Sequence, residues 1–397
     1  MLIKNSLKEN NIVFVITESF TFRFYLEKWI FNLADFSNIY IVGNFTNNEI
    51  TSLEKQFSEY SIKFHNICIK RKIDIKSDLN SIFLLRKFIL NIQNPVIFSI
   101  MPKANFIVSL IKIFSCNIKV ASIITGPFWL NFSKINLKYY FFRIIESFIF
   151  YQSNMVIFDS PSQKNFALKY LLFSSQSVKF FNTVSLGGVD LSNYFKSESK
   201  RLSFRDSMGI NSSRRVVGHF SRLCERKGTL DFLKVAQHII NTLEDPPIFY
   251  ISGPTEEQHV TDAIYEFSRK NSSHVIFKEG FFYNINEILN GIDILIMPSR
   301  WEGFGIVAAI SSATGTPVLG FDVVGLRDAI KSDITGYLVP PDDINELACL
   351  TIKLLEDGLL YTKLSDTAQS YARENFSTNI FLSDFKDLYS RLHDGNF

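Results

Sequence analysis

The chain has 397 residues, of which 46% are hydrophobic and 20% are charged, and this composition is typical of a globular protein rather than a disordered one. One hydrophobic core usually serves about 100–200 residues, so two domains are expected. The cysteines show no paired spacing, which argues against a zinc site or a disulfide framework and fits a reducing compartment; they are Cys68, Cys116, Cys224 and Cys349.

No segment of the sequence is expected to span a membrane. The most apolar stretches, 106–116 and 139–158, are interrupted by charged residues and fall short of the roughly 20 apolar residues that a span requires. The first residues, Met1–Asn5, lack the pattern of a secretory signal. We therefore expect a cytoplasmic protein.

The net charge of +3 conceals a difference between the two halves. Residues 1–200 hold 23 Lys and Arg against 13 Asp and Glu, whereas residues 201–397 hold 19 against 26. Within residues 60–145, 13 basic residues stand against Asp74 and Asp78 alone, among apolar helical patterns. That combination favours an anionic membrane surface as a partner. The alternative is a solvated basic face over a buried core; nucleic acid is not expected, since no recognition motif occurs.

Seven short apolar runs alternate with helical patterns in the first half. Such alternation is typical of a parallel sheet covered by helices on both faces, so we expect an α/β Rossmann-like domain over residues 1–195. The runs are Ile12–Thr17, Ile39–Gly43, Phe64–Ile69, Val96–Ile100, Val120–Thr125, Val156–Ser160 and Val178–Leu186.

The second half restarts the same pattern and predicts a second doubly wound domain over residues 196–376. Between the two domains, 187–190 and the polar stretch 197–213 indicate a linker, with the boundary near residue 195. Six apolar runs and then three helical patterns follow: Arg215–Gly218, Ile248–Ser252, Val275–Phe277, Ile294–Met297, Pro317–Gly320 and Gly336–Val339, then Asn345–Glu356, Tyr361–Phe376 and Phe381–His393.

The stretch from Ile292 to Pro341 is the most informative. A buried strand breaks at Pro298 and is followed by Ser-Arg-Trp-Glu-Gly-Phe-Gly, residues 299–305, which opens onto a helix. A glycine-rich helix start offers backbone N–H groups and a positive helix end, here beside the carboxylate of Glu302. Such an arrangement suits a ligand that combines a phosphate with a sugar.

This stretch continues through Gly-Thr-Pro-Val at 315–318, Gly-Leu-Arg-Asp-Ala at 325–329 and Thr-Gly-Tyr-Leu-Val-Pro-Pro at 335–341. The four pieces, in this order and spacing, closely resemble the donor-binding domain of glycosyltransferase family 4 (glycosyl transferases group 1), especially its capsule and O-antigen branch. The resemblance implies a GT-B fold: two Rossmann-like doubly wound parallel-sheet domains with a cleft between them. It also implies that a C-terminal helix within residues 377–397 packs back on the N-terminal domain.

The resemblance also implies roles for two cations. The loop after the second domain's first strand carries Arg222 and Lys227, which match the two positions that grip the donor diphosphate in the family. When a glycosidic bond to a nucleoside diphosphate breaks, negative charge grows on the leaving phosphate, and two fixed cations stabilise it without a metal. The alternative is that both are surface charges near a turn.

By the same resemblance, Glu302 is the first carboxylate of the family's E-x7-E motif and lies against the donor sugar near the reacting carbon. The alternative is a carboxylate that only favours the start of a helix. The residues after it are predicted to contact donor hydroxyls or phosphate, because glycine permits close approach; they are Gly303, Phe304, Gly305, Ile306 and Val307.

Besides the run His219–Ser221 before Arg222, the sequence departs from the family pattern at two places. Ile310 stands where the family has a second glutamate that holds the ribose of the nucleotide. Either Ser311 or Ser312 supplies a substitute hydrogen bond, or the nucleotide is held less well, or the protein no longer turns over; we favour retained activity. Thr125, followed by Gly126, stands where many relatives have a histidine facing the donor sugar. A threonine can donate a hydrogen bond but cannot accept a proton near neutral pH. Thr125 and Gly126 are therefore predicted to contact the substrate without acting as a base.

The end of the first strand carries two further candidates. Glu18 and Ser19 occupy the place of acceptor contacts in the family, although Ser19 could equally cap a helix. Asp190 resembles a hinge residue of the family and is interpreted as structural. No metal is expected, because the six histidines show no paired spacing and no Asp-x-Asp motif occurs.

Together these features predict a retaining glycosyltransferase that moves a sugar from a nucleoside diphosphate sugar to a lipid-linked glycan of bacterial surface polysaccharide. Its expected place is the inner face of the cytoplasmic membrane, and no cofactor is expected. Two alternatives stay open: a non-catalytic binding subunit of the same fold, suggested by Ile310 and Thr125, and a nucleotide-sugar epimerase.

Overall fold

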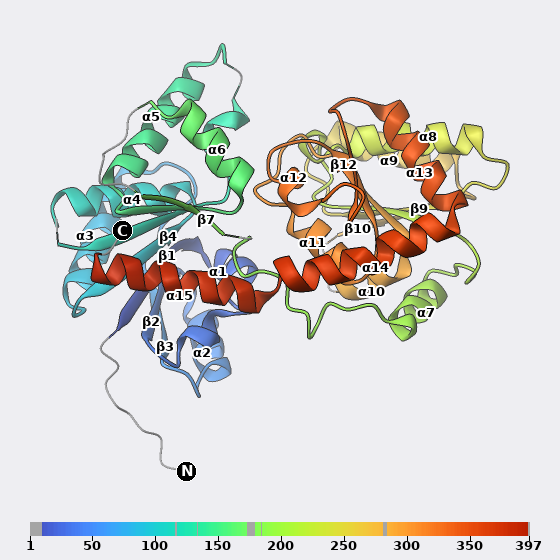
Figure 1. The fold of residues 1–397 in the computed structure, drawn as a ribbon. Helices are drawn as coiled ribbons and strands as arrows, with labels where there is room; N and C mark the ends of the chain where they lie inside the picture. Colours follow the sequence, from blue (N-terminus) through green and yellow to red (C-terminus); the bar gives the residue numbers. More distant parts are fainter. Residues whose placement is uncertain are drawn as a thin grey trace. The chain divides into compact units, whose positions relative to one another are not determined.

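The computed structural model describes residues 10–115, 117–132, 134–172, 179–183, 185–280 and 284–395 (Figure 1). Cys116 and the segment Met1–Asn5 therefore lie outside the described residues, as do Val178 and Val184 of the seventh apolar run. The chain forms two compact units. The first comprises Met1–Gly187 and Phe381–Phe397, and the second Gly188–Ile380, so the units part at Gly187–Gly188, earlier than the boundary expected near residue 195.

The first unit is built on a seven-stranded parallel sheet in the order β3-β2-β1-β4-β5-β6-β7. Its strands are β1 Asn11–Glu18, β2 Asn38–Asn44, β3 Ile62–Asn66, β4 Pro95–Ile100, β5 Lys119–Ile124, β6 Met155–Phe158 and β7 Lys179–Asn182. Its helices are α1 Ser19–Tyr25, η1 Ile30–Leu33, α2 Asn47–Gln56, α3 Ile75–Leu90, α4 Pro102–Ile113, η2 Phe128–Asn131, α5 Leu137–Gln152, α6 Pro161–Tyr170 and α15 Thr378–Asp394.

The second unit is built on a six-stranded parallel sheet in the order β10-β9-β8-β11-β12-β13. Its strands are β8 Val216–Phe220, β9 Ile248–Gly253, β10 Val275–Glu279, β11 Ile294–Met297, β12 Val318–Phe321 and β13 Gly336–Val339. Its helices are α7 Glu198–Ser207, η3 Glu225–Lys227, α8 Thr229–Thr242, α9 Gln258–Lys270, α10 Ile285–Gly291, α11 Ile306–Ala313, α12 Leu326–Ala329, α13 Ile344–Glu356 and α14 Gly358–Asn375.

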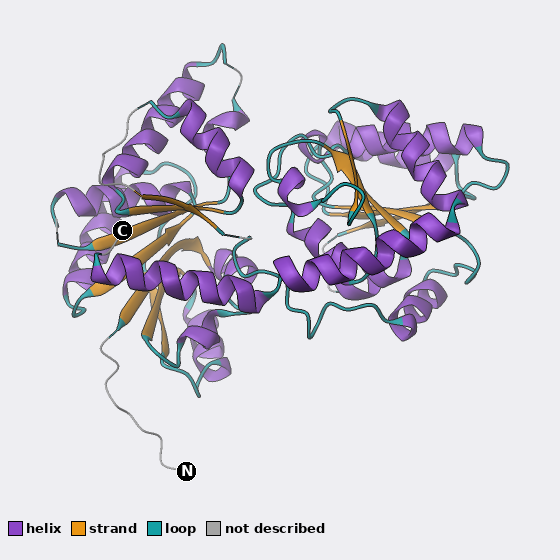
Figure 2. Cartoon of the chain, viewed as in Figure 1, coloured by secondary structure: helices purple, strands orange, loops and turns teal. Residues whose placement is uncertain are grey.

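Helices cover both faces of each sheet, as Figure 2 shows. Every predicted apolar run overlaps a strand, and the predicted pair of doubly wound parallel sheets is confirmed. The central strands, such as β1, β8 and β11, are buried on both faces, so they appear in the sequence as nearly continuous apolar runs, whereas the edge strands β3 and β10 carry exposed residues. Among the described residues, no helix is both long and apolar enough to cross a membrane.

The last helix supplies part of the first unit's core. Phe381 of α15 lies with its ring centroid 4.7 Å from that of Trp29, and Phe385 lies 4.8 Å from Phe98 of β4. Both phenylalanines are buried in the same cluster as Phe14 at the centre of the sheet. The apolar face of α15 therefore packs against the first sheet.

The polar stretch 197–213 was predicted to be a linker. It instead contains helix α7. Ser197 caps the helix by accepting from the backbone N–H of Lys200. Arg205 is 1% exposed and pairs with the buried Asp293 at 2.7 Å, while Phe204 lies against Tyr250. One buried ion pair and one aromatic contact fix a helix whose composition is otherwise polar, which explains why its sequence resembles a linker.

Candidate active site

Two motif residues that lie far apart in the sequence meet in the second unit. The ammonium group of Lys227 lies 2.7 Å from each carboxylate oxygen of Glu302. Their side chains are 17% and 10% exposed, so water screens this pair only weakly. The Ser299 hydroxyl donates to the same carboxylate at 2.8 Å. The predicted phosphate cation and the predicted sugar carboxylate therefore form one cluster.

Glycines bring the two loops of this cluster together. Gly228, directly after Lys227, has a φ of 71°, and a Cβ there would lie 1.8 Å from the carbonyl oxygen of Pro298. Gly325 has a φ of 82°, and its Cβ would lie 2.3 Å from the carbonyl oxygen of Glu302. Only glycine fits both the backbone conformation and the space, so the loops after β8, β11 and β12 can approach one another.

Arg222 lies in the loop after β8 but does not join the Lys227–Glu302 pair. Its guanidinium donates to both carboxylate oxygens of Glu256, at 2.9 and 3.1 Å. The side chains of Arg222 and Glu256 are 50% and 40% exposed. An exposed pair of this kind contributes little to stability, so the guanidinium can change partner at low cost when an anion arrives.

The glycine-rich loop leads directly into α11. Gly305 is the residue before the helix and has a φ of 91°. Gly303, Ile306 and Val307 are half-buried, whereas the ring of Phe304 is buried and lies 5.4 Å from that of Phe376. Phe304 therefore anchors the loop through its side chain, and only its backbone remains a candidate contact for a donor.

The helix also carries the departure from the family pattern. Ile310 is 6% exposed on α11. The Ser311 hydroxyl is fully buried and donates to the carbonyl of Thr316, and the Ser312 hydroxyl is buried and donates to the carbonyl of Ala308. Neither serine is placed to supply the substitute hydrogen bond that the sequence analysis considered.

Sequence reasoning missed the residues that hold the site in shape. His219 is buried beneath the loop, and its Nδ1 lies 3.0 Å from the Ile296 carbonyl, which can only accept. The ring proton is therefore on Nδ1, and Nε2 accepts from the Thr229 hydroxyl at 3.2 Å. Burial lowers the pKa of His219 to about 4, so the ring is neutral. A histidine one residue before the end of a buried strand, next to the loop, was the available signal.

Arg300 is a second supporting residue that sequence reasoning did not single out. Its guanidinium bridges Asp231 at 2.5 Å and Asp342, and it lies over the ring of Phe321. Its backbone N–H donates to the Arg226 carbonyl at 2.9 Å. Arg300 thereby ties the loop that carries Glu302 to the loop that carries Lys227. In the sequence, Arg300 is simply a basic residue between Ser299 and Trp301, so no local pattern indicates its role.

The predicted substrate contacts of the first unit lie at the ends of its strands. Thr125 and Gly126 follow β5 and are half-buried. Glu18 ends β1, and the Ser19 hydroxyl donates to Glu49 at 2.6 Å instead of capping α1. That hydrogen bond lowers the pKa of Glu49. Glu18, Ser19, Thr125 and Gly126 all belong to the first unit.

Asp190, interpreted as structural, forms local hydrogen bonds in the second unit. Its Oδ1 accepts from the backbone N–H and the hydroxyl of Ser192, and its Oδ2 accepts from the Asn193 side chain at 2.5 Å. Both partners are within three residues. Asp190 therefore shapes the turn after Gly188 and Val189.

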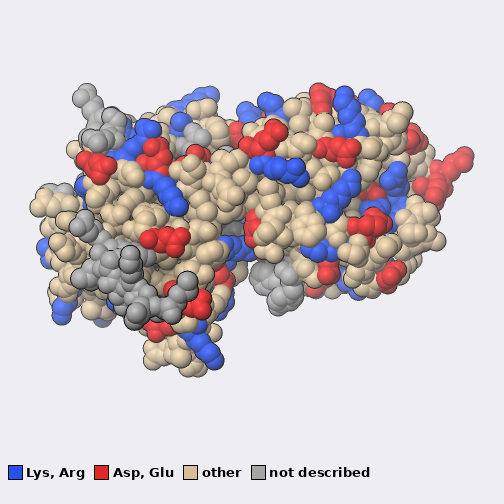
Figure 3. All heavy atoms as spheres, turned by 60° about the horizontal axis from the view of Figure 1, so that its bottom comes forward, with Lys and Arg blue, Asp and Glu red and all other residues tan. Residues whose placement is uncertain are grey.

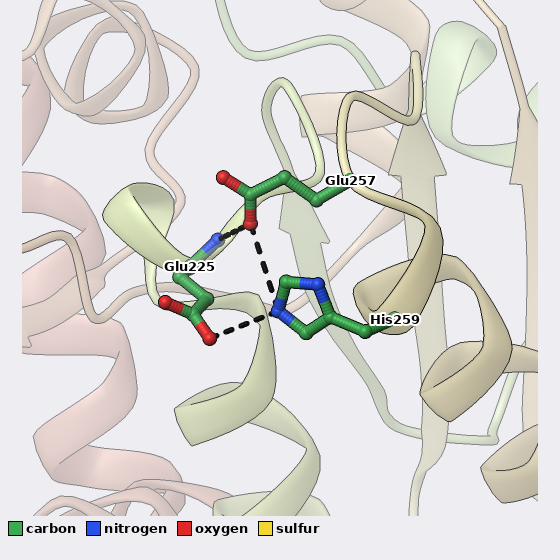
Figure 4. Close-up of side chains that lie close together, drawn as sticks. All are labelled: Glu225, Glu257 and His259. Atoms are coloured by element: carbon green, nitrogen blue, oxygen red, sulfur yellow. Dashed lines mark hydrogen bonds and ion pairs between the residues drawn. The ribbon is translucent and has the colours of Figure 1, made fainter.

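One group of side chains has the composition of a metal site. Glu225, Glu257 and His259 lie close together at the surface beside η3 (Figure 4). His259 Nε2 is 2.9 Å from Glu225, and the Glu225 backbone N–H donates to Glu257 at 2.9 Å. These contacts within the protein already account for the arrangement, so the group is better explained as a surface ion-pair cluster.

Comparison with known proteins finds a family match within the second unit. Residues 200–374 match the family described as Glycosyl transferases group 1. The capsular polysaccharide biosynthesis glycosyltransferase CapM of Staphylococcus aureus is 22% identical over 355 residues, covering 86% of this chain and 88% of that protein. The UDP-Gal:α-D-GlcNAc-diphosphoundecaprenol α-1,3-galactosyltransferase of Escherichia coli is 24% identical over 203 residues, covering 51% of this chain and 52% of that protein.

A solved structure has the same fold. Anabaena HepE, in complex with UDP and glucose, superposes with a TM-score of 0.78, covering 96% of this chain and all of HepE. Only 18% of the residues are identical, so this likeness concerns the GT-B fold alone.

Proposed function

We propose that this glycosyltransferase, whose residues 200–374 match the glycosyl transferases group 1, moves a sugar from a nucleoside diphosphate to a lipid-linked glycan of bacterial surface polysaccharide. The configuration at the anomeric carbon is retained in this proposal, and no metal or other cofactor takes part. The nucleoside diphosphate bound by HepE and the lipid diphosphate named for the E. coli relative support this choice of substrates.

The contact between Lys227 and Glu302 carries the proposal. A diphosphate that enters the cluster competes with Glu302 for the ammonium group of Lys227 and leaves the carboxylate to accept from sugar hydroxyls. Glu302 then orients the sugar, while the α11 N-terminus and the loop from Gly303 to Val307 lie beside the phosphate.

The chemistry requires only charge stabilisation. The bond from the anomeric carbon to the diphosphate oxygen breaks, a bond to the acceptor oxygen forms, and the acceptor proton leaves with the nucleoside diphosphate. Lys227 stabilises the growing negative charge on the leaving group from a protected position, and Arg222 does so after releasing Glu256. Glu18, Ser19, Thr125 and Gly126 are the proposed contacts for the acceptor and substrate.

Helix α3 of the first unit supports membrane association as part of the proposal. Its apolar side chains at 75, 79, 83 and 90 share one face and are each more than half exposed. The basic residues Lys76, Arg86 and Lys87 are also exposed on the helix. An exposed apolar stripe beside basic residues suits an anionic membrane surface, which would place the protein at the inner face of the cytoplasmic membrane. Figure 3 shows one face of the molecule, on which basic and acidic side chains are mixed.

The decisive experiment is a binding and hydrolysis screen against UDP-, GDP- and dTDP-sugars without added metal. Selective binding with slow hydrolysis of one donor is the expected result, and chelator should leave both unchanged. If no nucleoside diphosphate sugar binds, the proposed transfer is refuted.

Ile310 and the occupied hydroxyl of Ser311 favour one second candidate, a non-catalytic subunit that binds a glycan or a partner. The variant Ile310→Glu separates the two functions. If the wild type binds donor weakly and turns it over, the transferase stands. If Ile310→Glu gains donor affinity and neither protein turns over, the binding subunit is the better description.

A further inference from the structure

A small pocket in the first unit lies directly beside Thr125 and Gly126. It has a volume of about 30 Å³, above the roughly 10–15 Å³ that one water molecule requires, so a group larger than a single water fits. It lies at the carboxyl end of β5, where open parallel sheets bind ligands. It is contained within one unit and lies outside the Lys227–Glu302 cluster.

The walls of the pocket are mostly apolar. They include Phe128, whose ring lies 4.7 Å from that of Phe142, together with Ile145 and Ile149 of α5. Phe128 is 40% exposed, so it lies at the mouth, while Ile149 is buried. The walls therefore suit a small apolar group that enters from the solvent side.

One wall carries a buried acceptor that lacks a donor. Asn105 of α4 is 1% exposed, and its Nδ2 donates to the Ile123 carbonyl at 3.0 Å, which fixes the orientation of the amide. Its Oδ1 has no hydrogen-bond partner among the described residues. A buried acceptor without a partner costs about 1–3 kcal/mol, so a donor from outside the chain is favoured here.

A carboxyl group, that of Glu146, also lines the pocket. The indole N–H of Trp129 donates to Glu146, and burial raises the pKa of this carboxyl to about 8. At neutral pH the carboxyl is therefore mostly protonated and can donate a hydrogen bond. The nearest cation on the same helix, Arg143, donates to the Tyr170 carbonyl at 2.8 Å and lies over the Trp129 ring, so it does not neutralise Glu146 directly.

We propose that this pocket receives the acetamido group of a substrate sugar. The amide N–H donates to Asn105 Oδ1, the amide carbonyl accepts from the Glu146 carboxyl, and the methyl group lies against the apolar walls. A hydroxyl group would satisfy Asn105 but leave the apolar walls unfilled. A carboxylate cannot donate to the acceptor Asn105 Oδ1, and no lysine or arginine among the described residues lines the pocket to neutralise its charge. The inference rests on the proposed function, and the acetamido sugar belongs either to the donor or to the acceptor.

Two pairs of probes distinguish these sources by calorimetry. UDP-N-acetylglucosamine is compared with UDP-glucose, and the undecyl diphosphates of the same two sugars form the acceptor pair. A preference of about tenfold or more for the acetamido compound in one pair is expected, and the pair that shows it assigns the sugar to donor or acceptor. Saturation-transfer NMR should give its strongest signal on the acetamido methyl.

Three variants test the assignment within the pocket. Asn105→Leu should abolish the preference, whereas Glu146→Gln should keep most of it, because the amide still donates. Ile144→Ala changes an exposed α5 residue outside the pocket and should leave the preference unaltered. Unfolding midpoints identify a variant that fails to fold. In that case, the binding of the two pairs of sugar compounds to the wild-type protein decides whether the pocket receives an acetamido group.

The failures are distinguishable. If nucleoside diphosphates bind but neither pair is discriminated and the methyl signal is weak, the pocket holds only water and the inference is overturned alone. If no nucleoside diphosphate binds, the proposed function fails and the inference fails with it.

Discussion

The two units share an architecture but differ in what they place at the carboxyl ends of their strands. In both sheets the first strand of the unit lies beside the fourth, β1 beside β4 and β8 beside β11. The second unit gathers charged side chains there, with Lys227 and Glu302 at the centre. The first unit places an apolar pocket with neutral polar groups there, at Asn105 and Glu146. The fold alone does not determine recognition; the loops after the strands do.

The largest effect is expected from removing the cation of the charged site. Lys227→Ala should lower transfer about 10²–10³-fold, because the leaving diphosphate loses its most protected positive charge. Steady-state kinetics with the donor found in the screen measures this. Lys270→Ala, which removes an exposed lysine paired with Glu266, is the matched control and should retain activity. Unchanged turnover in Lys227→Ala would refute the diphosphate assignment.

A smaller effect, on stability, tests the buried ion pair between Arg205 and Asp293 in the second unit. Arg205→Ala should lower the free energy of unfolding by about 3 kcal/mol, because Asp293 loses its most buried partner and four carbonyls lose a donor. Arg201→Ala removes a more exposed partner of the same carboxylate and should cost less. Chemical denaturation of both variants gives the comparison, and equal losses would contradict it.

The two units are expected to respond to pH in opposite directions. The unfolded chain protonates His219 near its ordinary pKa of 6.5, but burial lowers the folded pKa to about 4. The second unit therefore loses stability as pH falls from about 6.5 to 4. Burial raises the pKa of Glu146 to about 8 and that of Asp159 to about 7, from 4.5 and 3.8. The first unit therefore loses stability as pH rises from about 4 to 8.

Hydrogen exchange resolved by unit, at pH 5 and pH 8, measures these trends, which are expected to be on the order of 2 kcal/mol in the second unit and larger in the first, where two carboxyl groups contribute. His219→Gln should flatten the trend in the second unit only, and Glu146→Gln should reduce that in the first only. The same direction of change in both units would show that other groups dominate.

The smallest effect concerns the surface of the first unit. The double variant Leu79→Asn and Phe83→Asn on α3 should weaken sedimentation with anionic liposomes about tenfold at low salt, because two exposed apolar side chains are lost. Leu359→Asn, which changes an exposed leucine of the second unit, is the control. If the wild type itself fails to sediment, the basic residues form only a solvated face.

Strands and motifs were predictable because both depend on local sequence. Buried parallel strands form continuous apolar runs, and Lys227 and Glu302 belong to motifs with fixed spacing. Helix α7 was not predictable, since its stability depends on Asp293, 88 residues from Arg205. The same holds for Asn105 and Glu146, which lie on different helices and become a pocket only when α4 and α5 pack beside β5. Long-range partners of polar residues leave no local pattern.

The position of helix α15 at the end of the chain determines the order in which the two units can finish folding during synthesis. The second unit is one continuous segment, 188–380, and all of it has been synthesised before Phe381 emerges from the ribosome. The first unit lacks the cover of Trp29 and Phe14 until Phe381 and Phe385 arrive. The half of the protein that is translated first can therefore be completed only last, against the usual N-terminal-first order of folding during translation.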